Sequence, residues 1–281
     1  MNNYKFFFLL LLSLTTSFIK SDPQIKVNFK DNLFIKVRVP DRGIVCSNVE
    51  RVNRLKDLLK NATLHKTSWG TNVYIGTYKN RPMFIVNAPV GSGSGLVFTE
   101  LYAAGAVYIV RFGSDDVKSP QHYEFDIVKL VNESDNLVGY SHASGVAPEK
   151  WAEAIPASKK LLNAFKANVK FHNLRSEERI CHHLENYHAL RNPKIYSPER
   201  QARIQKILSK LKRGKDIKES FDMETAVLYQ VAQDYERHAI TLLQTVDKES
   251  LIGPYAGQNL EKALVNERKI STYALDTLAQ L

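Results

Sequence analysis

The stretch Val90-Gly-Ser-Gly-Ser-Gly-Leu-Val-Phe-Thr-Glu-Leu-Tyr-Ala-Ala-Gly-Ala-Val-Tyr-Ile-Val-Arg-Phe-Gly-Ser114 predicts a glycine-rich turn, a helix and a strand in direct succession. Residues 106–110 are apolar throughout, which is typical of a strand covered on both faces of its sheet. The strand then runs into Arg111, Gly113 and Ser114, which offer a guanidinium and a hydroxyl to an anion. We therefore expect an α/β fold with an anion site at the carboxyl end of this strand.

The glycine-rich turn at 91–95 is a weaker signal. Backbone N–H groups of a turn that starts a helix can hold an anion. The turn lacks the Gly-Lys-Ser/Thr of a P-loop and the spacing of a dinucleotide-binding motif. By itself such a turn is more often only a tight connection, but its position before the strand 106–110 favours a role in the same site.

A second segment, Phe221-Asp-Met-Glu-Thr-Ala226, starts an amphipathic helix and places Met223 and Glu224 at its beginning. An apolar side chain there lies beside a carboxylate. Glu224 fits two roles, because its carboxylate can accept hydrogen bonds from two sugar hydroxyls or can stabilise the positive end of the helix dipole.

The rest of the chain alternates between strand and helix patterns, without an internal repeat or a second domain. Strands are expected at 43–46, 73–78, 83–87, 125–131 and 239–246, and helices at 49–59, 149–168, 223–235 and 260–281. The region 169–220 is rich in His, Arg and Lys and gives no clear pattern. With 281 residues and 44% hydrophobic content the chain can bury a large core, so we expect one α/β domain over 22–281.

The net charge of +10 suggests anionic ligands, but the positive charge is spread along the chain and is densest at 206–218. A nucleic-acid-binding surface would carry aromatic side chains within such a basic run, and this run has none. We interpret it as a solvated, lysine-rich helix face and do not expect nucleic acid as a partner.

Residues 1–21 are predicted to be a signal peptide. Lys5 precedes the apolar run 6–12, which is too short to span a bilayer comfortably. An uncleaved anchor is the alternative, since no small-x-small cleavage site follows. We expect a secreted or secretory-pathway protein with no stable membrane insertion after cleavage.

Entry into the secretory pathway would make Asn61 and Asn132 possible glycosylation sites and would permit a disulfide. The chain contains two cysteines, Cys46 and Cys181, each in an apolar context. We interpret them as buried free thiols rather than as a disulfide.

The segments 89–114 and 221–232 resemble the purine nucleoside and uridine phosphorylases, in the hexamer-forming branch that includes the methylthioadenosine nucleosidases. The resemblance extends over 37–281 in the order of elements. It implies a three-layer α/β/α fold around a central mixed sheet, assembled as homodimers or homohexamers in which the dimer completes each site. It also implies a nucleoside and phosphate as partners, with phosphate as co-substrate and no metal or organic cofactor.

The resemblance assigns the phosphate to Arg51, Arg111 and Ser114. Arg111 and Ser114 match the family's phosphate arginine and the hydroxyl that follows its glycine. Arg51 matches the arginine of the family's Gly-Asp-Pro-x-Arg element, although that element's first three residues are Ser-Asn-Val at 47–49 here.

Two further positions depart from the family. A phosphate arginine supplied by the neighbouring subunit should fall near Trp69, which is no anion ligand, and Lys66 is the only substitute. The family's Cys-Gly after the serine is Asp115-Asp116 here. A carboxylate beside bound phosphate would repel it by several kcal/mol in a poorly solvated pocket, so we expect these aspartates to weaken phosphate binding.

The resemblance assigns the nucleoside to Met223 and Glu224 at the ribose and Tyr196 at the base. Tyr196 read alone is more often a packing residue. Asp247 follows a buried strand and matches the general acid that protonates a departing purine, a step that contributes about 10²–10⁴-fold. An aspartate after a strand is also a common turn former. The histidines at 172, 182, 183 and 188 lack ligand spacing, so a metal site is not expected.

These observations predict a nucleoside phosphorylase that forms a free base and ribose 1-phosphate. A non-catalytic homologue that keeps the fold for storage or nucleoside binding is the alternative, favoured by Trp69, Asp115 and Asp116. A hydrolytic nucleosidase is the third hypothesis, for which Glu50 is the only nearby carboxylate that could activate water.

Overall fold

The computed structural model describes residues 33–115, 127–135, 145, 148–150, 153–186, 188, 193–210, 219–245 and 256–281. They belong to one compact unit, Leu33–Leu281. The predicted signal peptide at 1–21 and the positions of Asp116 and Asp247 lie outside the described residues. None of the helices in the described part is long and apolar enough to span a membrane.

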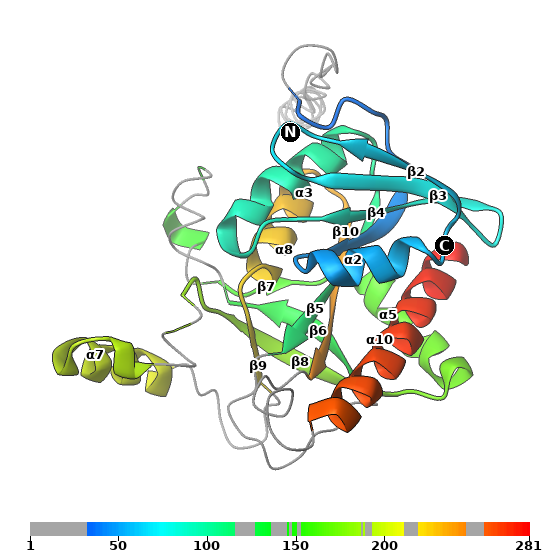
Figure 1. Ribbon diagram of the computed structural model, residues 1–281. Helices are drawn as coiled ribbons and strands as arrows, with labels where there is room; N and C mark the ends of the chain where they lie inside the picture. Colours follow the sequence, from blue (N-terminus) through cyan, green and yellow to red (C-terminus); the bar gives the residue numbers. More distant parts are fainter. Residues whose placement is uncertain are drawn as a thin grey trace, which may run out of the picture. The chain divides into compact units, whose positions relative to one another are not determined.

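A mixed sheet forms the centre of this unit (Figure 1), with strand order β2-β3-β4-β1-β5-β10-β6-β8-β9 and β7 paired to β6. Strands β4, β1, β5 and β10 are parallel, whereas β6 runs antiparallel to β10. The bounds are β1 Arg42–Cys46, β2 Lys60–Lys66, β3 Asn72–Tyr78, β4 Arg81–Asn87, β5 Tyr108–Asp115, β6 Ile127–Ser134, β7 Ile155–Pro156, β8 Arg175–His183, β9 Glu219–Asp222 and β10 His238–Thr245.

Helices cover both faces of the sheet (Figure 1). Helices α3 and α8 pack against each other on one face, and α2, α5 and α10 lie on the other. The helix bounds are α2 Val49–Lys56, α3 Ser94–Ala103, α5 Lys159–Asn168, α7 Pro198–Lys210, α8 Thr225–Asp234 and α10 Ala256–Ala279. The predicted three-layer α/β/α fold with a mixed sheet is therefore confirmed.

The core follows the apolar runs of the sequence. Strand β5 has Ile109, Val110 and Phe112 at zero exposure, and the neighbouring strands β1, β4 and β10 are almost fully buried as well. Cys46 and Cys181 lie in this core as free thiols, which confirms the prediction of two buried thiols. Burial raises the pKa of Cys46 to about 12.

Two helix boundaries differ from the prediction. The helix expected at 149–168 begins only at Lys159, because Pro156 lies in β7 and the Ser158 hydroxyl caps the helix by accepting a hydrogen bond from the Leu161 N–H. The helix expected at 223–235 begins at Thr225. Met223 and Glu224 consequently lie in the connection between β9 and α8, where their side chains can reach a cavity.

The sheet curls so that β9, at one end of the strand order, contacts the central strand β5. Strands β5 and β9 are separated in the sheet order by β10, β6 and β8. Even so, the Asp115 carboxylate on β5 accepts hydrogen bonds from the Ser220 hydroxyl and the Phe221 N–H on β9. This contact brings the end of β9, and with it residues 222–224, to the carboxyl end of β5.

Candidate active site

A cavity of about 420 Å³ lies at the carboxyl ends of β1 and β5. This edge of an α/β sheet is where ligands commonly bind. The cavity brings together five residues predicted from three separate segments, namely Arg51, Arg111, Ser114, Met223 and Glu224. The other residues that line it are Ser47, Asn48, Val49, Glu50, Val90, Gly113 and Asp222.

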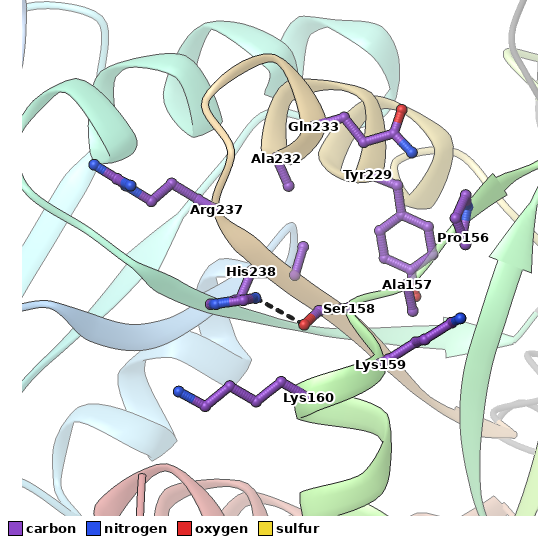
Figure 2. A pocket seen from close by; sticks show the side chains of 11 residues that line it. Pro156, Ala157, Ser158, Lys159, Lys160, Tyr229, Ala232, Gln233, Arg237 and His238 are labelled. Carbon is purple, nitrogen blue, oxygen red and sulfur yellow. Dashed lines mark hydrogen bonds between the residues drawn. The ribbon is translucent and has the colours of Figure 1, made fainter.

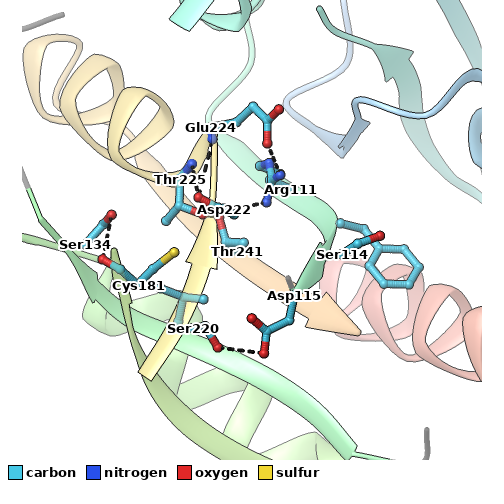
Figure 3. Close-up of polar contacts among 12 residues, drawn as sticks. Arg111, Ser114, Asp115, Ser134, Cys181, Ser220, Asp222, Glu224, Thr225 and Thr241 are labelled. Atoms are coloured by element: carbon cyan, nitrogen blue, oxygen red, sulfur yellow. Dashed lines mark hydrogen bonds and ion pairs between the residues drawn. The ribbon is translucent and has the colours of Figure 1, made fainter. Parts of the chain in front are cut away.

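Arg111 is the centre of the cavity wall (Figure 3). Its guanidinium pairs with Asp222 at 2.7 Å and also with Glu224, and all three side chains are almost fully buried. Burial alone would lower the pKa of Arg111, but the charges of Asp222 and Glu224 raise it above its ordinary value. The buried Nε–H of Arg111 has no hydrogen-bond partner among the described residues.

Glycine at position 113 makes room for this guanidinium. A Cβ atom placed on Gly113 would lie 2.3 Å from the Nη1 atom of Arg111, far inside van der Waals contact. The two buried ion pairs hold Arg111 in place, so the clash could be relieved only by breaking them. The Arg-Phe-Gly-Ser sequence therefore has a steric reason for its glycine.

Arg51 forms the second cationic part of the cavity and reaches the predicted hydroxyl. Its Nη2 group donates to the Ser114 hydroxyl at 3.3 Å, and its Nη1 group donates to the carbonyl of Phe112 at 3.2 Å. Its Nε group pairs with Glu267 of α10 at 3.0 Å. Burial would raise the pKa of Glu267, but hydrogen bonding from Arg54 and the charge of Arg51 lower it below its ordinary value.

The first N–H groups of the glycine-rich turn bind carboxylates of the chain itself. Gly91, with φ of 76°, directs its N–H to the Glu224 carboxylate at 2.9 Å. The Ser92 N–H and hydroxyl donate to Glu185 at 3.1 and 2.7 Å. Hydrogen bonding from His183 and Ser92 lowers the pKa of Glu185 to about 2. The turn therefore positions Glu224, and its anion-binding capacity is used within the protein.

Asp115 contradicts the expectation that it would repel an anion in the cavity. Its side chain is 1% exposed and points away from Arg111 toward Ser220 (Figure 3). Its charge is paired with Lys129 on β6. Arg111 and Asp115 lie on the same face of β5, because side chains alternate along a strand, but they bind different groups. The Arg111 guanidinium binds Asp222 and Glu224, whereas the Asp115 carboxylate binds Lys129 and Ser220. Asp116, the other aspartate of the prediction, is outside the described residues.

Three predicted positions, Tyr196, Trp69 and Lys66, are not among the described residues that line the cavity, and Asp247 lies outside the described residues. The centre of the Tyr196 ring lies 4.1 Å from the Cζ atom of Arg200, and its place in the nucleoside site stays a prediction. Trp69 is 66% exposed and contacts Phe34, and Lys66 lines a separate cavity with Phe34. Asp247 follows β10, whose last residue, Thr245, pairs with Asp115. The described strand thus ends at the same sheet edge as Ser114.

Sequence reasoning missed three acidic residues that set the charge of the site. Asp222, Glu185 and Glu267 bind Arg111, Ser92 and Arg51 respectively. Asp222 could have been found, since it lies two residues before Glu224 and at the end of a strand. Burial would raise its pKa, but the charge of Arg111 and hydrogen bonds from Thr225 lower it.

The buried charges that line the cavity cancel. Arg51 and Arg111 contribute two positive charges, and Asp222 and Glu224 contribute two negative charges. An anion that enters must therefore share Arg111 with carboxylates already bound to it. In the described part of the chain, no group of three or more His, Cys, Asp or Glu side chains is placed to hold a metal ion.

Comparisons with known proteins address the fold. Neither the models of known protein families nor the curated protein sequences give a match. Among solved structures, the chain is similar to a uridine phosphorylase from Vibrio fischeri, with 21% identity, a TM-score of 0.70, and coverage of 87% of this chain and 93% of the other. It is also similar to a purine nucleoside phosphorylase from Toxoplasma gondii in complex with immucillin-H, with 15% identity, a TM-score of 0.65, and coverage of 86% and 93%.

A third similar structure is the 5′-methylthioadenosine/S-adenosyl homocysteine nucleosidase from Campylobacter jejuni, with 16% identity and a TM-score of 0.64. The match covers 86% of this chain and all of the nucleosidase. These structures cover both reaction types that the sequence resemblance suggested. The chain has the fold shared by the nucleoside phosphorylases and the methylthioadenosine nucleosidases.

Proposed function

We propose that the protein is a nucleoside phosphorylase, which cleaves the N-glycosidic bond of a purine nucleoside or uridine with phosphate. The observation that supports this proposal best is the contact of Arg111 with Glu224 in one cavity that also contains Arg51 and Ser114. An anion bound by the two arginines would lie next to a carboxylate suited to a sugar diol. That juxtaposition is what phosphorolysis of a nucleoside requires.

In this mechanism Arg51, Arg111 and Ser114 bind phosphate, and Glu224 accepts hydrogen bonds from the ribose hydroxyls while Met223 packs against the sugar. The C1′–N bond breaks, its electron pair leaves with the base, and C1′ gains positive charge that Glu224 and phosphate stabilise. A phosphate oxygen then bonds to C1′ and gives ribose 1-phosphate. For a purine, Asp247 would protonate the departing base.

The proposal needs phosphate as a co-substrate and includes no metal or organic cofactor. We also propose a homodimer or homohexamer, because the exposed Trp69 occupies the position at which the resemblance implies a residue facing a second subunit. Secretory targeting by residues 1–21 stays a prediction.

One observation favours a second candidate, a nucleoside-binding homologue without turnover. Each buried guanidinium of the cavity is already paired with a carboxylate of the chain. Phosphate gains less from a cavity whose buried charges sum to zero than from a positive one. A protein with this charge balance could retain the ribose site and lose phosphate binding.

The test is release of free base from inosine, uridine and methylthioadenosine, with and without phosphate. The proposal predicts release from at least one of them only when phosphate is present. Release without phosphate would indicate hydrolysis, with Glu50 in the cavity as the first residue to substitute. Saturable nucleoside binding without release would indicate the second candidate.

The nucleoside site itself is tested by Glu224→Ala. Loss of the charged hydrogen-bond acceptor should weaken nucleoside binding by at least about 1–2 kcal/mol, measured by calorimetry with a non-cleaved nucleoside analogue. Glu178→Ala is the matched control, because Glu178 forms an exposed ion pair with Lys166. Equal affinities for the two variants would remove Glu224 from the site.

A further inference from the structure

A second cavity, of about 340 Å³, lies where β10 begins (Figure 2). Strand β10 starts at His238 beside this cavity and ends at Thr245, which pairs with Asp115 near the first cavity. With a rise of 3.2–3.4 Å per residue, the two ends of the strand are roughly 20 Å or more apart. The second cavity is therefore separate from the candidate active site.

Basic residues from two segments line this cavity, namely Lys159, Lys160, Arg237 and His238. No aspartate or glutamate is among its described lining residues. Lys159 and Arg237 form no ion pair or side-chain hydrogen bond with the described part of the chain. Figure 2 shows Lys160, Arg237 and His238 extending toward the same side, whereas Lys159 extends toward the other. This arrangement differs from the active site, where every buried guanidinium has a carboxylate.

The partners of the other two basic residues leave the positive charge in place. Lys160 donates to the Tyr108 hydroxyl and lies 4.7 Å from the centre of that ring, and both contacts are with a neutral group. The His238 ring stacks on Tyr108 and shares a hydrogen bond of 2.9 Å with the Ser158 hydroxyl. Burial and the charges of Lys160 and Arg237 lower the pKa of His238, which indicates a positive potential at its ring.

The fold adds backbone donors and an apolar wall. Ser158 caps helix α5 by accepting from Leu161, so the N–H groups of Lys159 and Lys160 belong to the unpaired first turn of the helix. They lie at the same cavity as the four basic side chains. The opposite part of the wall is formed by Pro156, Ala157, Ala232 and Ala239, with the ring of Tyr229.

We propose that this second cavity binds a small soluble phosphate monoester. The phosphate would be held by Lys160 and Arg237 beside His238, and the organic part would rest on the apolar wall. Two permanent cations that have no carboxylate partner in the cavity bind a dianion better than a monoanion. A helix start supplies N–H donors that suit phosphate oxygens.

The experiment uses the His238 ring as a local reporter in the full chain. Imidazole NMR resonances are followed in a titration with phenyl phosphate, with inorganic phosphate in a parallel titration. A bound dianion stabilises the imidazolium, so the pKa of His238 should rise in the complex. The response to inorganic phosphate should require higher concentrations, because the apolar wall stays uncovered.

The variant Lys160→Gln/Arg237→Gln should weaken phenyl phosphate binding by at least about tenfold, since charge-assisted hydrogen bonds are the strong contacts of such a site. Lys60→Gln/Lys194→Gln is the matched control, because it removes the same two charges from exposed positions elsewhere. Ser114→Ala, a change in the first cavity, should leave the His238 response unchanged.

Four results would overturn the proposal. The first is no His238 response at millimolar phenyl phosphate. The second is equal loss of affinity in the two double variants, which would show a general charge effect. The third is a response lost in Ser114→Ala but kept in Lys160→Gln/Arg237→Gln, which would assign the binding to the first cavity. Equal affinities for inorganic and phenyl phosphate would refute the monoester and its apolar wall.

Discussion

Arg111→Met tests the charge arrangement of the candidate active site. The substitution keeps an unbranched side chain of moderate length and removes the guanidinium that Asp222 and Glu224 share. Both carboxylates are almost fully buried, so neither can regain water in its place. Asp222 keeps hydrogen bonds from Thr225, and Glu224 keeps one from the Gly91 N–H, but no cation among the described residues that line the cavity is placed to replace Arg111.

Removal of one partner from a buried ion pair costs about 3–5 kcal/mol, because it leaves an uncompensated charge. We expect the free energy of unfolding at pH 7 to fall by about that amount. The matched control is Arg54→Met. Arg54 is 44% exposed, and its partner Glu267 keeps the ion pair with Arg51. An exposed pair contributes about 0–1 kcal/mol, so this control should change stability by no more than that.

The pH dependence gives a second readout with a defined sign. In the natural protein the pKa of Asp222 is below its ordinary value, so its contribution to stability is present above the unfolded pKa and is lost as the pH falls through the lowered pKa. Without Arg111 that pKa rises, and protonation of Asp222 relieves the unpaired charge as the pH falls. The stability difference between the natural protein and Arg111→Met should therefore shrink from pH 7 to pH 4.

The measurement is urea-induced unfolding of both variants and the natural protein at several pH values, with the slope of each transition compared. A loss below about 1 kcal/mol for Arg111→Met, or a difference that does not change with pH, would refute the reasoning. Similar losses for Arg111→Met and Arg54→Met would do the same, since only the first removes a buried charge shared by two carboxylates.

Three more predictions concern the same region. Gly113→Ala should lower the melting temperature and abolish base release, because the alanine Cβ would lie 2.3 Å from the Nη1 atom of Arg111. An active variant with the stability of the natural protein would show that the guanidinium can move freely. Lys129→Met should cost about 3–5 kcal/mol by leaving Asp115 unpaired, and Lys129→Met/Asp115→Asn should recover part of the loss; no recovery in urea unfolding would refute the pair. A thiol reagent at pH 8 should label neither Cys46 nor Cys181 in the native protein, and it should label both when the protein is unfolded without a reducing agent. Two unreactive cysteines in the unfolded chain would demonstrate a disulfide.

The sequence predicted the centre of the fold because its strands there are apolar and continuous. Strands β1, β5 and β10 carry such runs, and β5 ends in the Arg111 to Ser114 segment that identified the anion site. The edge strand β2 and the strand β8, which lies between β6 and β9, were missed because they are largely polar, with exposed or partly exposed residues along most of their length. Periodicity fails where a strand is buried on neither face.

Site residues that belong to short sequence motifs were predicted, and site residues whose partners are far away in the sequence were missed. Arg111, Ser114 and Glu224 belong to short motifs that can be read directly from the sequence. The partners of the arginines are distant, with Glu267 separated from Arg51 by 216 positions and Asp222 separated from Arg111 by 111. Such pairs depend on how the sheet curls, which no local pattern encodes.

The expectation for Asp115 was wrong for the same reason. Its carboxylate is bound by Lys129 on β6 and by Ser220 on β9, and no local pattern in the sequence indicates either partner. A residue that looked harmful to phosphate binding instead fastens β9 to β5 and so positions Glu224.

The central claim is that this cavity transfers a ribosyl group to phosphate, and the product tests it most directly. The natural protein would be incubated with inosine or uridine and inorganic phosphate and followed by ³¹P NMR. The account predicts a new phosphate-ester resonance, that of ribose 1-phosphate, growing in step with the free base and absent with Glu224→Ala. Free base accompanied only by unesterified ribose, or an unchanged inorganic phosphate signal with every nucleoside, would contradict it.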